Sequence, residues 1–121
     1  MFVKGIKDYD KFSNEADVIV SDGQYDILCY CYQTSYHCIG NKVENITSLF
    51  ACEIMRVDNN DFCIDKLDAY YSYHLQGEIV NIEKPIIRIG NLYINIDSHL
   101  PKDIKKGEWI ELKVERLECS L

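Results

Sequence analysis

The sequence is poor in several features, and each shortage narrows what the chain can be. Its 121 residues include two prolines, one tryptophan and six dispersed glycines, so we expect no proline-rich linker and no glycine-rich loop around a phosphate. The longest unbroken apolar run, Ile27–Tyr32, is far too short for a membrane span or a signal peptide. We therefore expect a cytosolic (cytoplasmic) chain.

Basic residues are also scarce. Thirteen Lys and Arg face 20 Asp and Glu, which gives a formal net charge of −7, and only three of the cations are arginines. A nucleic-acid backbone or an anionic membrane requires a cationic binding surface, so neither is expected to be the main partner. The length and the 47% hydrophobic content predict one globular domain spanning residues 1–121.

Alanine is rare, whereas residues that favour strands are abundant. Three alanines stand against sixteen isoleucines and nine tyrosines, a composition typical of β-structure. Asp22-Gly23 and Gly90-Asn91 each lie between short apolar segments, which predicts two β-hairpins with two-residue turns.

The two turns predict which residues pair across each hairpin. Around Gly90-Asn91, Ile89 pairs with Leu92 and Ile87 with Ile94, and these four residues share one face with Ile96. The apolar and polar residues of this hairpin separate almost completely, because the polar residues fall on the opposite face.

The same reasoning applied to Asp22-Gly23 pairs Val20 with Tyr25 and Val18 with Ile27. It places Val18, Val20, Tyr25, Ile27, Cys29 and Cys31 on one face, the core face. The outer face begins polar at Asp26 and becomes apolar at its far end, an asymmetry that requires an explanation.

Three further strands are predicted. The first is Ser48–Val57, the second is Tyr70–Ile82 with a bulge or bend at Gly77, and the third is the amphipathic segment Glu108–Glu115. The apolar alternation slips after Val114, which predicts another bulge near Glu115-Arg116.

Helix is expected only as short turns, over Lys7–Ala16 and over Leu100–Gly107. The prediction is therefore a mostly β fold: a small antiparallel barrel or sandwich with one or two short helical turns. The segment Leu100–Glu118, with a short turn, Lys-Lys-Gly and a final strand with charged outer residues, resembles the ending of small five-stranded oligonucleotide/oligosaccharide-binding (OB-like) barrels. The resemblance identifies no family.

Six cysteines in a chain expected to be cytosolic predict reduced thiols packed as small hydrophobic residues rather than disulfides. Cys29-x-Cys31 with His37-Cys38 resembles a metal-ligand cluster, but its spacing matches no familiar zinc motif and both strand cysteines fall on the core face. The interpretation favoured is burial, with no metal and no cofactor.

Two other segments contain residue types found in active or metal sites. Asp97-Ser98-His99 has three catalytic-triad residue types in a row, whereas triad members come from separate elements. Asp58–Asp61 resembles the start of a calcium loop, but Cys63 and Ala69 stand where glycine and the bidentate glutamate are required. No catalytic residues are therefore predicted.

The candidate binding residues are Asp26, Leu28, Tyr30 and Tyr32, on the outer face of the second predicted strand. Tyrosines among acids suit a protein partner, and a basic one would complement the net charge. An inhibitor or immunity-type protein that blocks a cationic toxin would have this profile. Alternatively, the N-terminal segment covers this face through Tyr9 and Phe12.

Three other possibilities stay open. The chain could bind single-stranded nucleic acid or a small ligand, provided that its few cations converge, namely Arg88, Arg116, Lys102, Lys105 and Lys106. It could instead be a metal- or thiol-dependent enzyme, or an exposed strand edge could pair two copies into a homo-oligomer.

Overall fold

The computed structural model describes residues 1–32 and 34–121, and within them the fold is entirely β. The mostly β prediction is confirmed, whereas no helix forms in either predicted segment. The strands are β1 (Phe2–Asp10), β2 (Glu15–Ser21), β3 (Asp26–Cys31), β4 (Asn45–Leu49), β5 (Cys52–Arg56), β6 (Cys63–Lys66), β7 (Tyr73–Asn81), β8 (Ile86–Ile89), β9 (Leu92–Asn95), β10 (Trp109–Val114) and β11 (Arg116–Ser120). None of the described residues forms a helix long and apolar enough to cross a membrane.

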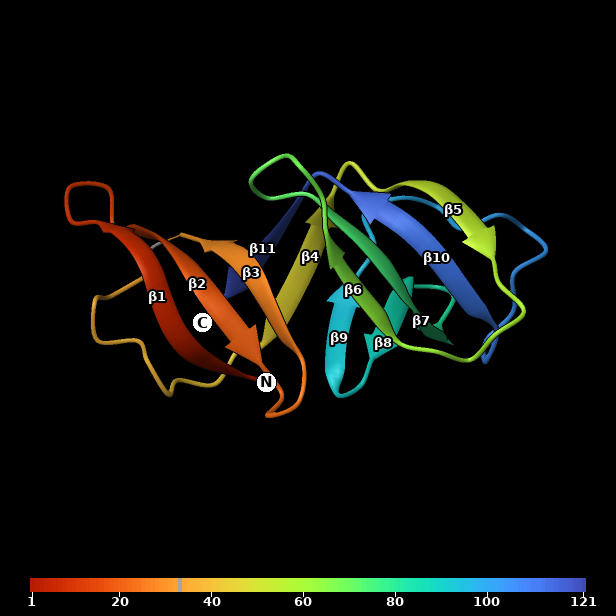
Figure 1. Cartoon of the computed structure of the whole chain (residues 1–121), viewed down its shortest axis with the longest axis horizontal. Helices are drawn as coiled ribbons and strands as arrows, with labels where there is room; N and C mark the ends of the chain where they lie inside the picture. Colours follow the sequence, from red (N-terminus) through yellow and green to blue (C-terminus); the bar gives the residue numbers. More distant parts are fainter. Residues whose placement is uncertain (33) are drawn as a thin grey trace.

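The strands form one mixed sheet, which is bent rather than closed. Its order is β1-β2-β3-β11-β4-β9-β8-β7-β10-β5, with β6 paired to β7. Most pairs are antiparallel, but β3–β11 and β4–β9 are parallel. Figure 1 shows β1, β2 and β3 on one side of the molecule and β5, β7 and β10 on the other. A closed or OB-like barrel is therefore not confirmed, because β1 and β5 remain at the two ends of the sheet.

The segment predicted as an N-terminal helix is a β-hairpin. β1 pairs with β2 from Phe2↔Ser21 to Asp10↔Glu15, and the connecting turn contains Asn14 with φ of 56°. The Asp10 carboxylate accepts a hydrogen bond from the Phe12 amide inside this turn. Pairing with the buried strand β2 therefore overrides the local helical pattern.

The second predicted hairpin is confirmed in register and in face. Ile87 pairs with Ile94 and Ile89 with Leu92, as the turn at Gly90-Asn91 requires. All four side chains are fully buried, and Ile96 continues the same face. Gly90 adopts φ of 59°, a conformation that side chains disfavour.

The first predicted hairpin exists, but its register was predicted two residues off. Val20 pairs with Ile27, not with Tyr25, so the loop has four residues, 22–25. The Asp22 carboxylate explains the longer loop, because it accepts hydrogen bonds from the Tyr25 amide inside the loop and from the Asn91 amide in the other hairpin turn. A shift of two residues preserves the predicted faces.

The predicted strand Ser48–Val57 is two strands separated by a corner. Phe50 has φ of 55° and its side chain is exposed, and the chain turns there from β4 to β5. Asp97 holds the corner: its carboxylate accepts hydrogen bonds from the Phe50 amide at 2.8 Å, the Ala51 amide at 3.1 Å and the Ser48 hydroxyl at 2.7 Å. The triad-like segment 97–99 therefore contains a structural aspartate.

The bulge predicted at Gly77 is wrong. β7 runs through Gly77 in regular register with β10, and the irregularity lies further on, between Ile79 and Asn81. Glycine is needed because a Cβ at position 77 would lie 2.2 Å from the Arg88 carbonyl oxygen on β8. The residue marks close contact of two backbones rather than a bend.

The end of the chain behaves largely as predicted. Ile110, Leu112 and Val114 are buried on β10, and Leu117 and Cys119 are buried on β11. The slip in alternation is real, but it marks the passage from one strand to another at Glu115 rather than a bulge within one strand. β10 pairs with β7 and β5, whereas β11 pairs with β3 and β4.

Replacing Tyr73 by phenylalanine is expected to lower the free energy of unfolding by about 1–2 kcal/mol. Tyr73 is buried, and its hydroxyl accepts a hydrogen bond from the Leu28 amide at 2.9 Å, which joins the two sides of the molecule. Urea denaturation should show a lower midpoint with unchanged slope. Tyr93→Phe on β9, where the side chain is exposed, is the control. Equal midpoints for the two variants would contradict the prediction.

Candidate functional site: an acidic tyrosine cleft

The four predicted binding residues all lie on or just after β3, but the structure places them in different surroundings. Asp26 begins the strand and forms an exposed ion pair with Lys4 at 2.6 Å. Leu28 is buried, Tyr30 is half-buried, and Tyr32 is 49% exposed. The rings of Tyr30 and Tyr32 lie 4.9 Å apart, so these two residues form a pair at the end of β3 that is distant from Asp26.

The segment that precedes and begins β7 covers much of this face. Tyr73 contacts the Leu28 amide, and the Tyr71 ring lies 6.2 Å from the Tyr30 ring. The alternative cover by Tyr9 and Phe12 does not form, because Phe12 is 89% exposed and Tyr9 pairs with Ala16 on the opposite face, where its ring contacts Tyr36. The apolar end of the outer face is thus explained by contact with residues 70–73, which are remote in sequence.

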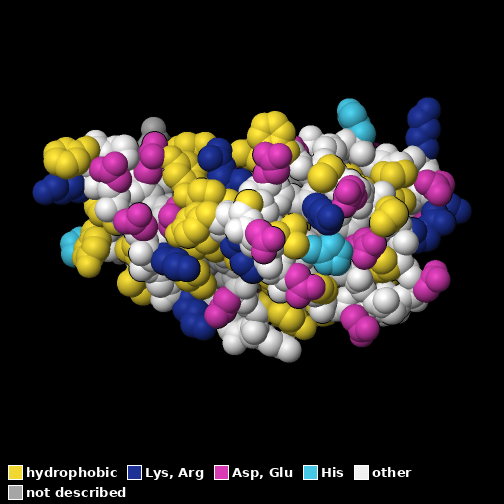
Figure 2. Space-filling view, turned by 45° about the horizontal axis from the view of Figure 1, so that its top comes forward, with side chains coloured by type: hydrophobic (Ala, Val, Ile, Leu, Met, Phe, Trp, Pro, Cys, Tyr) yellow, Lys and Arg dark blue, Asp and Glu magenta, His cyan; other side chains and the backbone are white. Residues whose placement is uncertain are grey.

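A cleft of about 140 Å³ opens beside these tyrosines. β1, β2 and β3 supply most of its wall, and Tyr71 closes one side. The residues that line it are four acids, three tyrosines and one alanine: Asp8, Tyr9, Asp10, Glu15, Ala16, Asp17, Tyr30 and Tyr71. Tyr9 pairs with Ala16 across β1 and β2, so the side chains of these two residues lie on the opposite face of the sheet from the four acids and Tyr30. Figure 2 shows hydrophobic and acidic side chains interleaved over much of one face of the molecule. We call this site the acidic tyrosine cleft.

Hydrogen bonds hold the tyrosines in their protonated form. Asp17 is buried and accepts from the Tyr71 hydroxyl at 2.7 Å and the Tyr70 hydroxyl at 3.1 Å. Burial and the Asp17 carboxylate raise the pKa of Tyr71, and a hydrogen bond with Glu15 raises the pKa of Tyr30 to about 12. These hydroxyls act as donors to carboxylates, which fixes the positions of the acids that line the cleft.

The tyrosine pair already holds one cation of the chain itself. The Arg116 guanidinium lies 4.9 Å from the centre of the Tyr30 ring and donates to Glu118 Oε1 at 2.6 Å. The Tyr32 hydroxyl donates to the same oxygen at 2.7 Å. An aromatic face next to a carboxylate is the surrounding that favours a guanidinium, so Arg116 shows the chemistry available at the cleft.

Among the cations that nucleic-acid binding would require, the two arginines do not lie on one common surface. Arg88 on β8 is paired with Glu78 at 2.9 Å and lies over the Phe62 ring. Arg116 on β11 is paired with Glu118. β4 and β9 separate these two strands in the sheet.

The cysteines of the predicted cluster lie in the core. Cys29, Cys31 and Cys38 are buried, whereas His37 is exposed. A hydrogen bond with the Cys119 thiol and burial raise the pKa of Cys31, so this thiol stays protonated. Burial of Cys29 and Cys31 as small hydrophobic residues is thus confirmed.

A different cysteine belongs to a cluster that sequence reasoning missed. Among the residues that the structure describes, Cys63, Asp65 and His74 form the one group of three metal-ligating side chains whose donor atoms lie within 4.8 Å of one another. Cys63 and Asp65 are two residues apart on a strand, so their side chains point to the same face. The contribution of His74 depends on the pairing of β6 with β7, which no local pattern specifies.

The cleft and the cluster have to be interpreted from their own geometry. No protein-family model, no curated protein and no solved structure matches this chain.

Proposed function

We propose that this chain is a non-catalytic, cytosolic binding protein whose partner is a basic protein that places an arginine or lysine side chain in the acidic tyrosine cleft. The observation that carries the proposal is the composition of the cleft, in which four carboxylates and the rings of Tyr30 and Tyr71 line a space of about 140 Å³. A cationic side chain there would gain both carboxylate pairing and contact with aromatic rings.

The charge of the whole chain supports the same partner. The net charge of −7 would attract a cationic protein over a distance and accelerate its capture. Tyr32 and Tyr70 lie exposed next to the cleft and extend the contact area with little loss of side-chain entropy. Inhibition of a basic toxin or nuclease, as by an immunity-type protein, is the biological role that this chemistry fits.

A titration of isotope-labelled protein with a short arginine-rich peptide tests the proposal. We expect the NMR signals of Glu15, Asp17 and Tyr30 to shift, and binding to weaken as salt is added. Asp8→Asn with Glu15→Gln should reduce affinity at least tenfold, about 1.4 kcal/mol. Asp10 and Asp17 are left unchanged because both also hold the structure together. Asp10 accepts a hydrogen bond in the β1–β2 turn, and Asp17 accepts from the Tyr70 and Tyr71 hydroxyls.

The matched control is Asp58→Asn with Glu83→Gln, which removes the same two charges from exposed loops outside the cleft. Equal weakening by both double variants would mean that net charge alone attracts the peptide, and the cleft would lose its role. Titration with a labelled oligonucleotide at about 50 mM salt separates the nucleic-acid alternative, since backbone contacts are strongest at low salt.

A further inference from the structure

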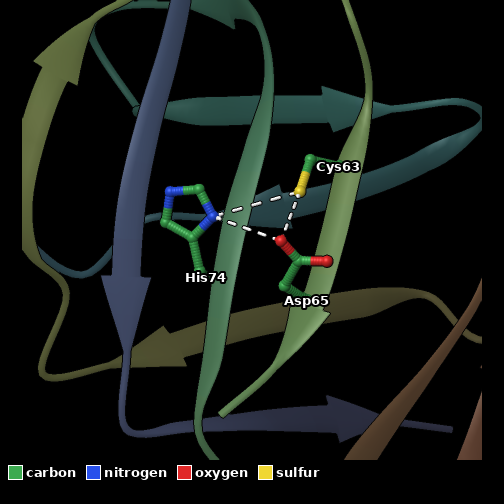
Figure 3. Close-up of side chains that lie close together, drawn as sticks. All are labelled: Cys63, Asp65 and His74. Atoms are coloured by element: carbon green, nitrogen blue, oxygen red, sulfur yellow. Dashed lines mark hydrogen bonds and ion pairs between the residues drawn. The ribbon is translucent and has the colours of Figure 1, made fainter.

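Three side chains that ligate transition metals meet on the outer face of the sheet, away from the acidic tyrosine cleft. Cys63 and Asp65 lie two residues apart on β6, and Asp65 is the registered partner of His74 on β7 (Figure 3). All three side chains are at least partly exposed, so an ion could reach them from solvent. Sulfur, carboxylate oxygen and imidazole nitrogen are all ligands of Zn²⁺ in proteins.

The donor atoms already have nearly the spacing of a coordination sphere. Cys63 Sγ lies 3.1 Å from Asp65 Oδ2 and 3.9 Å from His74 Nδ1, and the distance between Nδ1 and Oδ2 is 3.9 Å. Tetrahedral zinc with bonds of about 2.0–2.3 Å places neighbouring ligand atoms about 3.3–3.5 Å apart. Side-chain adjustments of about half an ångström would therefore close the site, which is within the reach of rotations of partly exposed side chains.

A second carboxylate orients the histidine. His74 Nε2 lies 3.3 Å from Glu111 Oε2 on β10, and an ionised carboxylate only accepts hydrogen bonds. In the neutral ring the proton is therefore on Nε2, which leaves the lone pair of Nδ1 directed toward Cys63 and Asp65. Metal-bound histidines in proteins are held by carboxylates in the same manner.

We propose that Cys63, Asp65 and His74 bind one divalent transition-metal ion, Zn²⁺ best of all, with Glu111 positioning the histidine. Three protein ligands leave a fourth position for water or another ligand. Binding replaces the thiol proton: Cys63–SH and Zn²⁺ give a Cys63–S–Zn bond, and the proton is released to solvent. The bound ion would also link β6, a four-residue strand paired with β7, to the rest of the sheet.

The same residues invite a second interpretation, a nucleophilic thiol with His74 as base and Glu111 as its orienting acid. The contacts favour the metal. Asp65 Oδ2 is closer to the sulfur than the imidazole is, and it accepts the thiol hydrogen bond.

Cobalt binding is the direct test, because Co²⁺ occupies zinc sites and its spectrum reports the ligands. Chelator-treated, reduced protein should bind one equivalent of Co²⁺, with intense visible bands and a thiolate-to-metal charge-transfer band, and Zn²⁺ should displace it. Cys63→Ser should abolish the charge-transfer band, and His74→Gln should weaken binding at least 100-fold. Glu111→Gln should keep the band but weaken binding about tenfold.

Matched controls are available in the same chain. Cys52→Ser changes the exposed cysteine on β5, which pairs with β10 and not with β6 or β7, and His99→Gln changes an exposed histidine elsewhere. Both controls should bind cobalt as the unmodified protein does. Near-ultraviolet circular dichroism of every variant verifies the fold. Cys63→Ala, at a partly exposed position, gives a second test of the ligand if Cys63→Ser is misfolded.

Three results would overturn the proposal. One is a Kd for Zn²⁺ above about 10 µM, because zinc sites in proteins bind the ion far more tightly than that. Another is a charge-transfer band that survives Cys63→Ser, since the thiolate would then come from another cysteine. The last is rapid alkylation of Cys63 that depends on His74 in a chain that binds no cobalt, which would assign the cluster to nucleophilic chemistry instead.

Discussion

Gly77→Ala is expected to destabilise the fold by about 3 kcal/mol or more, and to lower the melting temperature by roughly 10 °C. The added Cβ would lie 2.2 Å from the Arg88 carbonyl oxygen and 2.9 Å from the Ile89 side chain. The oxygen belongs to the backbone of β8, so relief requires the two strands to separate. Ile87 and Ile89 are fully buried on β8, and separation would disturb their packing.

Gly5→Ala is the control, because a Cβ on that strand residue meets nothing within 4 Å. We expect its melting temperature to stay close to that of the unmodified protein. Thermal unfolding followed by circular dichroism measures both. If the two alanine variants were equally stable, β7 and β8 would not approach as closely as described.

Asp97→Ala is expected to cost about 2 kcal/mol of unfolding free energy at neutral pH. The carboxylate accepts hydrogen bonds from two amides and one hydroxyl at the corner between β4 and β5, where Phe50 has a positive φ. Removal leaves the buried Ser48 hydroxyl and the two corner amides without this acceptor. Urea denaturation with an unchanged slope measures the loss.

The cost of this substitution should depend on pH. Burial opposes ionisation of Asp97, but hydrogen bonds from Ser48, Ala51 and Phe50 outweigh it and lower the pKa in the folded state. A lowered pKa gives stability that is complete above the unfolded value, about 3.9, and that is lost as pH falls through the folded pKa. The stability difference between Asp97→Ala and the unmodified protein should therefore be constant near neutral pH and should shrink below about pH 4.

The control for Asp97 is Asp58→Ala, which removes one carboxylate from an exposed loop. It should have little effect on stability at neutral pH. A stability difference for Asp97→Ala that stays constant into acid would contradict the role given to its ionised carboxylate.

The accuracy of the sequence predictions depended on how local the deciding contacts are. The hairpin at Gly90-Asn91 was predicted in full because its turn residues and its alternating isoleucines are adjacent in sequence. The hairpin at Asp22-Gly23 was shifted because the Asp22 carboxylate bonds to the Asn91 amide, 69 positions away. The helix predicted over Lys7–Ala16 failed because pairing with β2 decides that segment.

The candidate sites show the same difference between contacts of sequence neighbours and contacts of distant residues. Tyr30 and Tyr32 were singled out from an apolar end on an otherwise polar face, and they border the acidic tyrosine cleft. The cleft itself also needs acids from β1 and β2 and the ring of Tyr71. No pattern near Cys63 indicates that His74 lies beside it, because that contact arises from the β6–β7 register.

The sequence by itself determined the β class, the alternation of faces, the burial of Cys29 and Cys31 and the acidic character, since each depends on composition or on neighbours two residues apart. Only the tertiary structure decided that the sheet stays open, that Gly77 marks the close approach of two backbones, and which side chains share a cleft or a metal cluster. The physical reason is that side chains converge through the pairing of strands distant in sequence, and period-two alternation chooses the face of a strand but not its neighbour.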